Sequence, residues 1–163
     1  MSNDLRRANL AAIPCESRPQ LPDGFRRAST RPGAALGATK TGLSVYELPP
    51  GQAVSPYHYE EPVEEWLLVV SGTPTVRHAD GEEQLEPWDV VFFPPGPTGA
   101  HLVRNDSDSV ARVAMFSSKS ELGAVVYPDT DLVWMWTEDD AVDLIVARGS
   151  AVEDIAPWIG GAR

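Results

Sequence analysis

Short apolar runs separated by turn residues are the feature that most constrains the fold of this chain. From residue 43 onward the runs recur at a spacing of about ten residues, and Pro, Gly and Asp fill the gaps. The predicted strands are 43–48, 64–70, 73–78, 82–87, 89–94, 101–105, 110–116, 124–128, 131–136 and 142–148. Fifteen prolines and thirteen glycines in 163 residues also favour short strands over long helices. The pattern predicts an all-β sandwich or barrel.

The two ends of the chain depart from this pattern. Residues 1–40 are rich in Arg, Pro and Ala, and we expect an extended arm that packs on a barrel formed by residues 41–163, in a single domain overall. Within the arm, Leu10–Ile13 and Phe25–Ser29 are predicted as short strands. Residues 151–158 (AVEDIAPW) are the one segment that suggests a short C-terminal helical turn.

Charge and cysteine content exclude several classes of protein. The net charge is −11, and the few Lys and Arg residues are scattered, which argues against nucleic acid binding. The lone Cys15 excludes an internal disulfide. No apolar run is long enough to span a membrane or to form a secretory signal, so we expect no membrane association and a cytoplasmic location.

Two stretches, 56–72 and 87–105, carry the residues with chemical potential. The first contains His58, Glu60 and Glu65, and the second contains His101 after a Pro/Gly turn. Two imidazoles and two carboxylates form a ligand set suited to a divalent metal ion. Because residues two apart in a strand share a face, His58 and Glu60 are expected to point the same way.

The same period of two orients the strand at 64–70. Glu65, Leu67 and Val69 share one face, which we assign to the barrel interior, with Glu65 at its mouth. A buried carboxylate is costly unless it is paired, and a metal ion would pair it. The opposite face is also apolar, so it needs cover from the arm, from the strand at 131–136 or from a second subunit. The large aromatics Trp66, Trp88, Phe92 and Phe93 are predicted to lie in the core, and His78 on the surface.

These stretches resemble the paired motifs of the cupin superfamily, in the version found in small single-domain bacterial cupins of the cupin-2-like kind. The first motif is matched by Gly51, His58, Glu60, Glu65 and Gly72. The second is matched by Pro94-Pro95-Gly96, then His101 and Asn105. The resemblance covers residues 40–148 and implies a double-stranded β-helix, or jelly-roll barrel. As one barrel hosts many chemistries, it indicates the fold more firmly than an activity.

Glu60 departs from the family pattern, because cupins usually carry a second histidine there. With His58, Glu65 and His101 it would give a harder ligand set, which favours manganese or iron over copper or nickel, with zinc as an alternative. Two other readings of Glu60 stay open. It could be a general base beside the metal, or a sign that the metal has been lost; without metal, Glu60 and Glu65 would share a proton.

The sequence therefore predicts a metal-binding cupin with a small molecule in the barrel mouth. As an enzyme it would be an oxygenase, isomerase or lyase acting on a small polar compound. The alternative is a non-catalytic ligand-binding or sensor cupin, with or without a metal. The sequence leaves catalysis open, since few acid–base groups remain beyond the four ligands. The resemblance and the apolar outer face also imply a homodimer.

Overall fold

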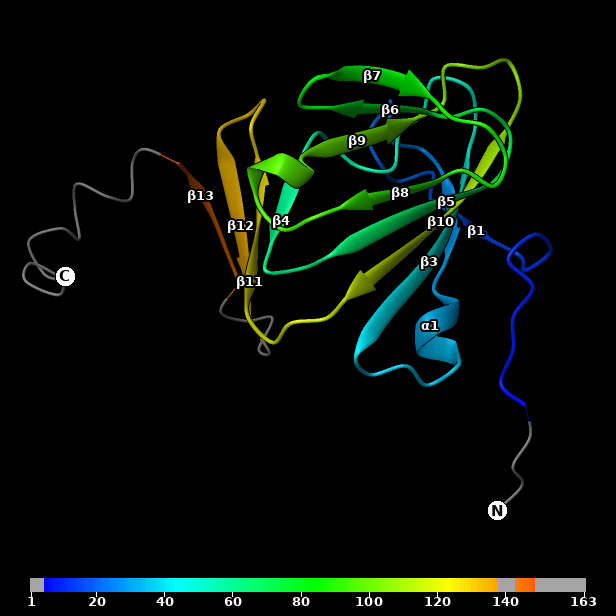
Figure 1. The fold of residues 1–163 in the computed structure, drawn as a ribbon, viewed down its shortest axis with the longest axis horizontal. Coiled ribbons are helices and arrows are strands. Elements are labelled where there is room, and N and C mark those ends of the chain that lie inside the picture. The colour runs from blue at the N-terminus through cyan, green and yellow to red at the C-terminus, as the bar shows by residue number, and fades with distance from the viewer. Residues whose placement is uncertain (1–4, 138–142, 149–163) are drawn as a thin grey trace, which may run out of the picture.

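The computed structural model describes residues 5–137 and 143–148, and these residues form three antiparallel sheets (Figure 1). The first sheet has the order β1 (Glu16–Ser17), β2 (Ala28–Thr30), β3 (Thr41–Leu48), β10 (Ala111–Ser118), β5 (Glu65–Ser71), β8 (Val90–Phe93). The second has the order β13 (Leu144–Ala147), β12 (Leu132–Trp136), β11 (Gly123–Tyr127), β4 (Tyr59–Glu61). The third has the order β7 (Gly81–Gln84), β6 (Thr75–His78), β9 (His101–Arg104). The all-β prediction is confirmed.

Two bridges join the smaller sheets into a wall that faces the first sheet. Ala53 pairs with Arg104 and His58 pairs with His101, so the segment before β4 runs antiparallel to β9. In Figure 1 the third sheet lies above and the second at the left, with β3, β10, β5 and β8 at the right. The sheets thus enclose a barrel interior, and His58 lies in the seam between two of them.

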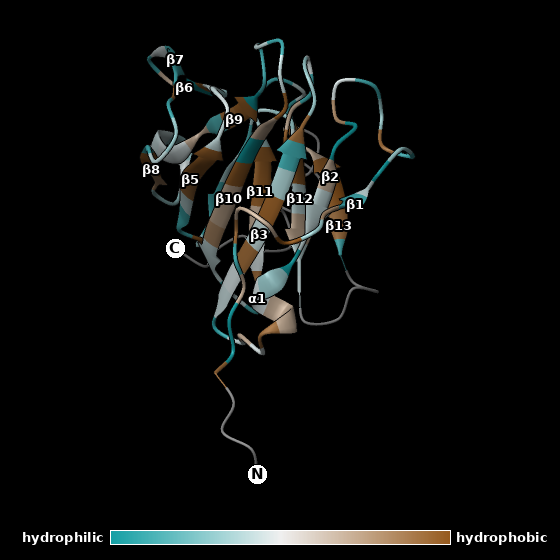
Figure 2. Cartoon of the chain, turned by 90° about the vertical axis from the view of Figure 1, so that its right-hand side faces the viewer, coloured by the Kyte–Doolittle hydropathy of each residue, from teal (hydrophilic) through white to brown (hydrophobic). Residues whose placement is uncertain are grey.

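The alternation along β5 follows the prediction. Leu67 and Val69 are fully buried and belong to the main core cluster. The other core members come from every wall of the barrel: Leu48, Val54, Val76, Leu85, Phe93, Val103, Val113 and Met115. In Figure 2 the strands of the first sheet carry both hydrophobic (brown) and hydrophilic (teal) stretches along their length. Glu65 begins β5 on the same inward face as Leu67.

The arm contains less strand than predicted. Leu10–Ile13 is a turn, because the Asn9 side chain accepts the Ala11 N–H and the Asn9 carbonyl accepts the Ile13 N–H. Such an Asn turn competes with extended backbone. The second predicted strand is shifted, with β2 at Ala28–Thr30, and it pairs with β3. The short helix α1 (Pro32–Ala35) follows it and was not predicted.

A buried arginine fixes this arm to the first sheet. The guanidinium of Arg112 donates to the carbonyls of Leu10 and Ile13 and pairs with the Glu47 carboxylate. Two predictions about the chain ends stay untested. The division at residue 40 remains a prediction, and the helical turn at 151–158 lies outside the described residues.

The prediction that the large aromatics lie in the core is wrong for three of four. Trp66, Trp88 and Phe92 are 45%, 74% and 41% exposed. Period two explains Trp66, which alternates with the buried Leu67, while Trp88 lies in the turn before β8 at a positive φ of 79°. Phe93 alone is buried, because its side chain points to the barrel interior.

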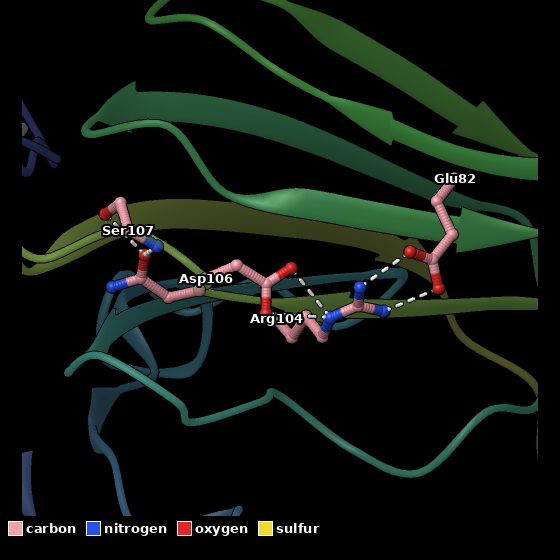
Figure 3. A network of polar contacts seen from close by, with 5 residues as sticks. Glu82, Arg104, Asp106 and Ser107 are labelled. Carbon is pink, nitrogen blue, oxygen red and sulfur yellow. Dashed lines mark hydrogen bonds and ion pairs between the residues drawn. The ribbon is translucent and has the colours of Figure 1, made fainter.

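The end of β9 is fixed by polar contacts that lie outside the barrel mouth. Figure 3 shows the Arg104 guanidinium between the carboxylates of Glu82 and Asp106, with two contacts to each. Next to it, the fully buried Asn105 donates to the carbonyls of Leu48 and Ser109. These contacts tie β9 to β7 and β3, which holds the start of β9 in place as well.

No helix among the described residues has the length and apolarity to cross a membrane. The helical segments in these residues are α1 and the short 3-10 turn η1 (Pro97–Gly99). The cytoplasmic location stays a prediction.

Candidate metal centre

Strand pairing brings the two motif histidines together. The backbone N–H of His58 donates to the His101 carbonyl at 3.0 Å, and the reverse bond is 2.8 Å. Residues paired in this way across an antiparallel ladder project side chains from the same face. The two imidazole rings accordingly lie 4.7 Å apart between centroids, and both residues are buried.

Local hydrogen bonds fix which nitrogen of each ring carries the proton. His58 Nδ1 lies 2.9 Å from the Pro56 carbonyl oxygen, and His101 Nδ1 lies 2.9 Å from that of Gly99. A carbonyl oxygen only accepts, so we assign the proton to each Nδ1. Ser55 Oγ also lies 3.0 Å from His58 Nδ1, and because it donates to the same Pro56 carbonyl it can accept from the ring. In the neutral rings both Nε2 atoms are therefore acceptors with a free lone pair. Metal-binding histidines are typically oriented by such carbonyl contacts.

Glu65 adds a carboxylate to the two imidazoles, and when it is ionised the three groups offer only acceptors to one another. Its Oε2 lies 3.5 Å from His101 Nε2 and 4.0 Å from His58 Nε2. The ligating atoms of the three residues all lie within 4.8 Å of one another. Glu65 Oε2 is buried and has no hydrogen-bond partner among the described residues. We call His58, Glu65 and His101 the acceptor cluster.

The pKa shifts show that this cluster disfavours charge on its own. Burial and the nearby charge of Glu60 raise the pKa of Glu65 to about 8. Burial and the proximity of His58 lower the pKa of His101 to about 3, and burial also lowers the pKa of His58. The two histidines are held neutral, and the Glu65 oxygen has no hydrogen-bond partner among the described residues. The lone pairs of these three groups converge, and such a site fits a divalent cation. The residues present thus suit the predicted metal.

Glu60 lies beside the acceptor cluster without joining it. The group within mutual ligand distance contains three of the four predicted ligands and not Glu60. Glu60 pairs with Val125 through β4 and β11, and it lines the same pocket as Glu65. Burial raises its pKa, and its charge contributes to the raised pKa of Glu65. The two carboxylates therefore interact electrostatically, although only Glu65 lies within ligand distance of the histidines.

Two aromatic rings frame the imidazoles. Phe93 stacks on His101 with 3.7 Å between centroids and 7° between planes, and Tyr127 stacks on His58 at 6.0 Å. Both imidazoles thus have an aromatic neighbour. Of the aromatics assigned to the core from the sequence, Phe93 thus contacts the site.

Sequence reasoning missed most of the pocket that opens above Glu65. This pocket has a volume of about 430 Å³ and includes Arg31, the residues 117–120, and two tryptophans of β12. Trp134 and Trp136 are two apart in a strand, so period two could have placed them on one face. Arg31 had no such signal, because it comes from the arm.

Comparison with known proteins gives a family and several structural neighbours. A family model described as a cupin domain matches residues 44–117. No curated protein matches the chain. The matched residues run from β3 to β10 and include all four predicted ligands.

Among solved structures, two similar chains cover nearly the whole molecule. One is a candidate sugar phosphate isomerase from Acidithiobacillus ferrooxidans, with a TM-score of 0.77 and 22% identity over 86% of this chain and 89% of that one. Another is a sugar phosphate isomerase of a cupin superfamily from Silicibacter pomeroyi, with a TM-score of 0.75 and 23% identity over 88% of this chain and 94% of that one. A polyketide cyclase from Streptomyces resistomycificus has a TM-score of 0.55 and 16% identity over 71% of this chain and 80% of that one. At these identities the likeness establishes the fold.

Proposed function

The chain carries a cupin domain over residues 44–117, and we propose that this domain binds one divalent transition metal and uses it on a small polar molecule. The acceptor cluster holds the ion, with manganese, iron or zinc as the candidates. One observation carries the proposal. The buried Glu65 Oε2 faces two imidazole nitrogens and has no donor among the described residues.

The proposed chemistry is proton transfer next to a carbonyl group, as in an isomerase. When bound, the metal supplies Lewis-acid polarisation of the substrate carbonyl. Glu60 takes the proton from the hydroxyl-bearing carbon beside that carbonyl and returns it to the former carbonyl carbon, while the hydroxyl proton moves to the former carbonyl oxygen. Its raised pKa suits this role, because a base works best when its pKa approaches the working pH. Two structural neighbours named as sugar phosphate isomerases support this choice of reaction.

Elemental analysis and hydrogen exchange together test this function. Protein purified without chelator should contain about one transition metal per chain, and His101→Ala should contain none. In D₂O the metal-loaded protein should introduce deuterium into glyceraldehyde at the carbon next to the carbonyl, and Glu60→Gln should not. A wild-type protein without stoichiometric metal would overturn the proposal.

The alternative is a cupin that binds a ligand without turning it over. The same experiment distinguishes this alternative. A protein that only binds its ligand would retain the metal, but it would incorporate no more deuterium than the metal ion does in solution without protein. The position of Glu60 in the same pocket as Glu65 favours the enzyme, since it offers a base beside the three ligands.

We also propose a homodimer that covers the edge of the first sheet. Trp66 and Phe92 are exposed and lie 4.6 Å apart between ring centroids on β5 and β8. β8 is the edge strand of that sheet, and the arm covers Leu68 and Val70 instead. Light scattering after size exclusion should give twice the chain mass, and Trp66→Glu should give a monomer. A wild-type monomer at micromolar concentration would contradict the dimer.

A further inference from the structure

Two cationic side chains at the pocket above Glu65 have no partner in the described part of the chain. Arg31 and Lys119 both line this pocket, and no hydrogen bond or ion pair holds either side chain. Several cations of the barrel are held in ion pairs, for example Arg77 with Asp129, Arg104 with Glu82 and Arg112 with Glu47. Arg31 and Lys119 are exposed and are therefore available to a ligand in the pocket that they line.

The backbone positions of both residues are fixed, although their side chains are free. Arg31 precedes α1, whose Pro32 and Gly33 are buried, and Gly33 packs closely on Leu43 of β3. Lys119 follows β10, and its N–H donates to the Lys40 carbonyl at 3.1 Å. The preceding Ser118 exchanges two bonds with Glu64, next to the acceptor cluster. Both cations are thus presented to the pocket by anchored segments.

The remaining walls of the pocket suit a hydroxylated carbon chain. Trp134 and Trp136 lie on one face of β12 with 6.0 Å between ring centroids, and Trp136 Nε1 donates to the Ser120 carbonyl. Aromatic faces pack well against the C–H side of a sugar. Serines 117, 118 and 120 also line the pocket; the Ser118 hydroxyl accepts from the Glu64 N–H, and the Ser120 hydroxyl donates to the Leu122 carbonyl.

We propose that Arg31 and Lys119 bind the phosphate group of a phosphorylated sugar whose carbonyl end lies at Glu65. This inference rests on the proposed function and adds the substrate class. Glu60 and Glu65 line the same pocket and would repel an anion, so the phosphate is expected at Arg31 and Lys119 and not at the carboxylates. A doubly charged phosphate uses two cations, and Arg offers it paired donors while Lys acts as a point charge.

Calorimetric titration of four proteins with three probes tests the assignment. The probes are glucose 6-phosphate, glucose and gluconate, and the proteins are wild type, Arg31→Gln, Lys119→Met and Lys40→Met. Lys40 is the matched control, because it is the other lysine of the chain and contacts Lys119 through its backbone without lining the pocket. Metal content is measured for each protein first, and Lys119→Arg is titrated in addition as a fifth protein, the conservative variant.

Wild type should bind glucose 6-phosphate at least about tenfold more tightly than glucose. Arg31→Gln and Lys119→Met should each lower that affinity about tenfold without changing the affinity for glucose. Lys40→Met should match wild type, and Lys119→Arg should retain most of the affinity.

The results that would overturn the phosphate site differ from those that would overturn the proposed metal site. No binding of glucose 6-phosphate, equal binding of glucose, or an equal loss in Lys40→Met would overturn the phosphate site. Gluconate bound as tightly as glucose 6-phosphate would replace phosphate by a carboxylate and also overturn it. Absence of metal in the wild type would contradict the proposed function, whereas the contrast among the four proteins would still decide the anion site.

Discussion

Two buried polar sites lie at opposite ends of β9, and they differ in whether their hydrogen bonds are made. Asn105, directly after the strand, is 0% exposed, and its amide donates to two carbonyls while its oxygen accepts from Ser107. His101, at the start of the strand, is 2% exposed, and its Nε2 meets only other acceptors within the acceptor cluster. Both residues come from one sequence motif.

The difference separates a structural polar site from a functional one. A buried polar group that is fully paired holds the fold, and removing it leaves its former partners unsatisfied. A buried group without a partner costs stability until a ligand supplies the missing charge. Mutations at the two ends of β9 should therefore have opposite effects on stability and on metal binding.

The largest effect is expected for Glu65→Gln. Loss of the anionic ligand should lower metal affinity by more than about 100-fold, because both charge and coordination are lost. Above pH 8, where the wild-type Glu65 carboxyl is ionised, the metal-free variant should be at least as stable as wild type, since the new amide can donate to a histidine Nε2. Metal titration and urea unfolding of the same samples measure both. Full metal affinity in this variant would contradict the acceptor cluster.

Asn105→Ala should show the reverse behaviour. We expect the free energy of unfolding to fall by about 2–3 kcal/mol, because the carbonyls of Leu48 and Ser109 lose their donor. Metal content per folded chain should stay near wild type. Urea unfolding gives the first number and elemental analysis the second. Unchanged stability would remove the contrast between the two ends of β9.

Much of this contrast could be predicted from the sequence. Period two correctly placed Glu65, Leu67 and Val69 on the inward face, and it oriented His101 because that residue begins a strand. Each strand predicted from apolar patterning between residues 43 and 136 overlaps a strand of the structure. The metal assignment itself stays a prediction.

Other features depended on contacts that the pattern does not contain. Leu10–Ile13 looks like a strand by composition, but the Asn9 side chain closes a turn there. Trp66 looks like core by size, but the neighbouring Leu67 takes the inward face. Arg31 reaches the pocket through tertiary packing of α1, for which residues 1–40 give no periodic signal. Glu60 shares a pocket with Glu65, yet the sequence could not tell a ligand from a neighbour.

The pH dependence of the metal-free protein sharpens the comparison. The pKa of Glu65 is raised from 4.5 to about 8 on folding, so the folded state keeps a proton that the unfolded chain has released. The Glu65 contribution to stability should therefore fall as the pH rises from 4.5 to 8, by at most about 1.4 kcal/mol per pH unit. The lowered pKa values of His58 and His101 act below 6.5, where stability is lost as the pH falls.

Urea unfolding with chelator present measures this slope, and Glu65→Gln is the control. The variant should lose most of the decline, and only the smaller contribution of Glu60, whose pKa is also raised, should remain. Asn105→Ala should keep the full slope despite its lower stability. An identical slope in wild type and Glu65→Gln would show that Glu65 does not carry the proton.

The smallest effect is expected at Glu60. If it acts beside the metal, Glu60→Ala and Glu60→His should both retain the ion within a few-fold of wild-type affinity, and only deuterium incorporation should be lost. If it is a ligand, Ala should lower occupancy and His should retain it. Metal occupancy of the three proteins distinguishes the two roles, and equal occupancy favours the neighbouring position that the structure shows.

The most direct measurement is an anomalous difference map from a crystal of metal-loaded protein, recorded at the absorption edge of the bound element. One peak is expected between His58 Nε2, His101 Nε2 and Glu65 Oε2, at about 2.0–2.2 Å from each atom. No peak is expected at the same position in His101→Ala crystals. A loaded crystal with no peak there, or with the metal bound elsewhere, would contradict the central claim.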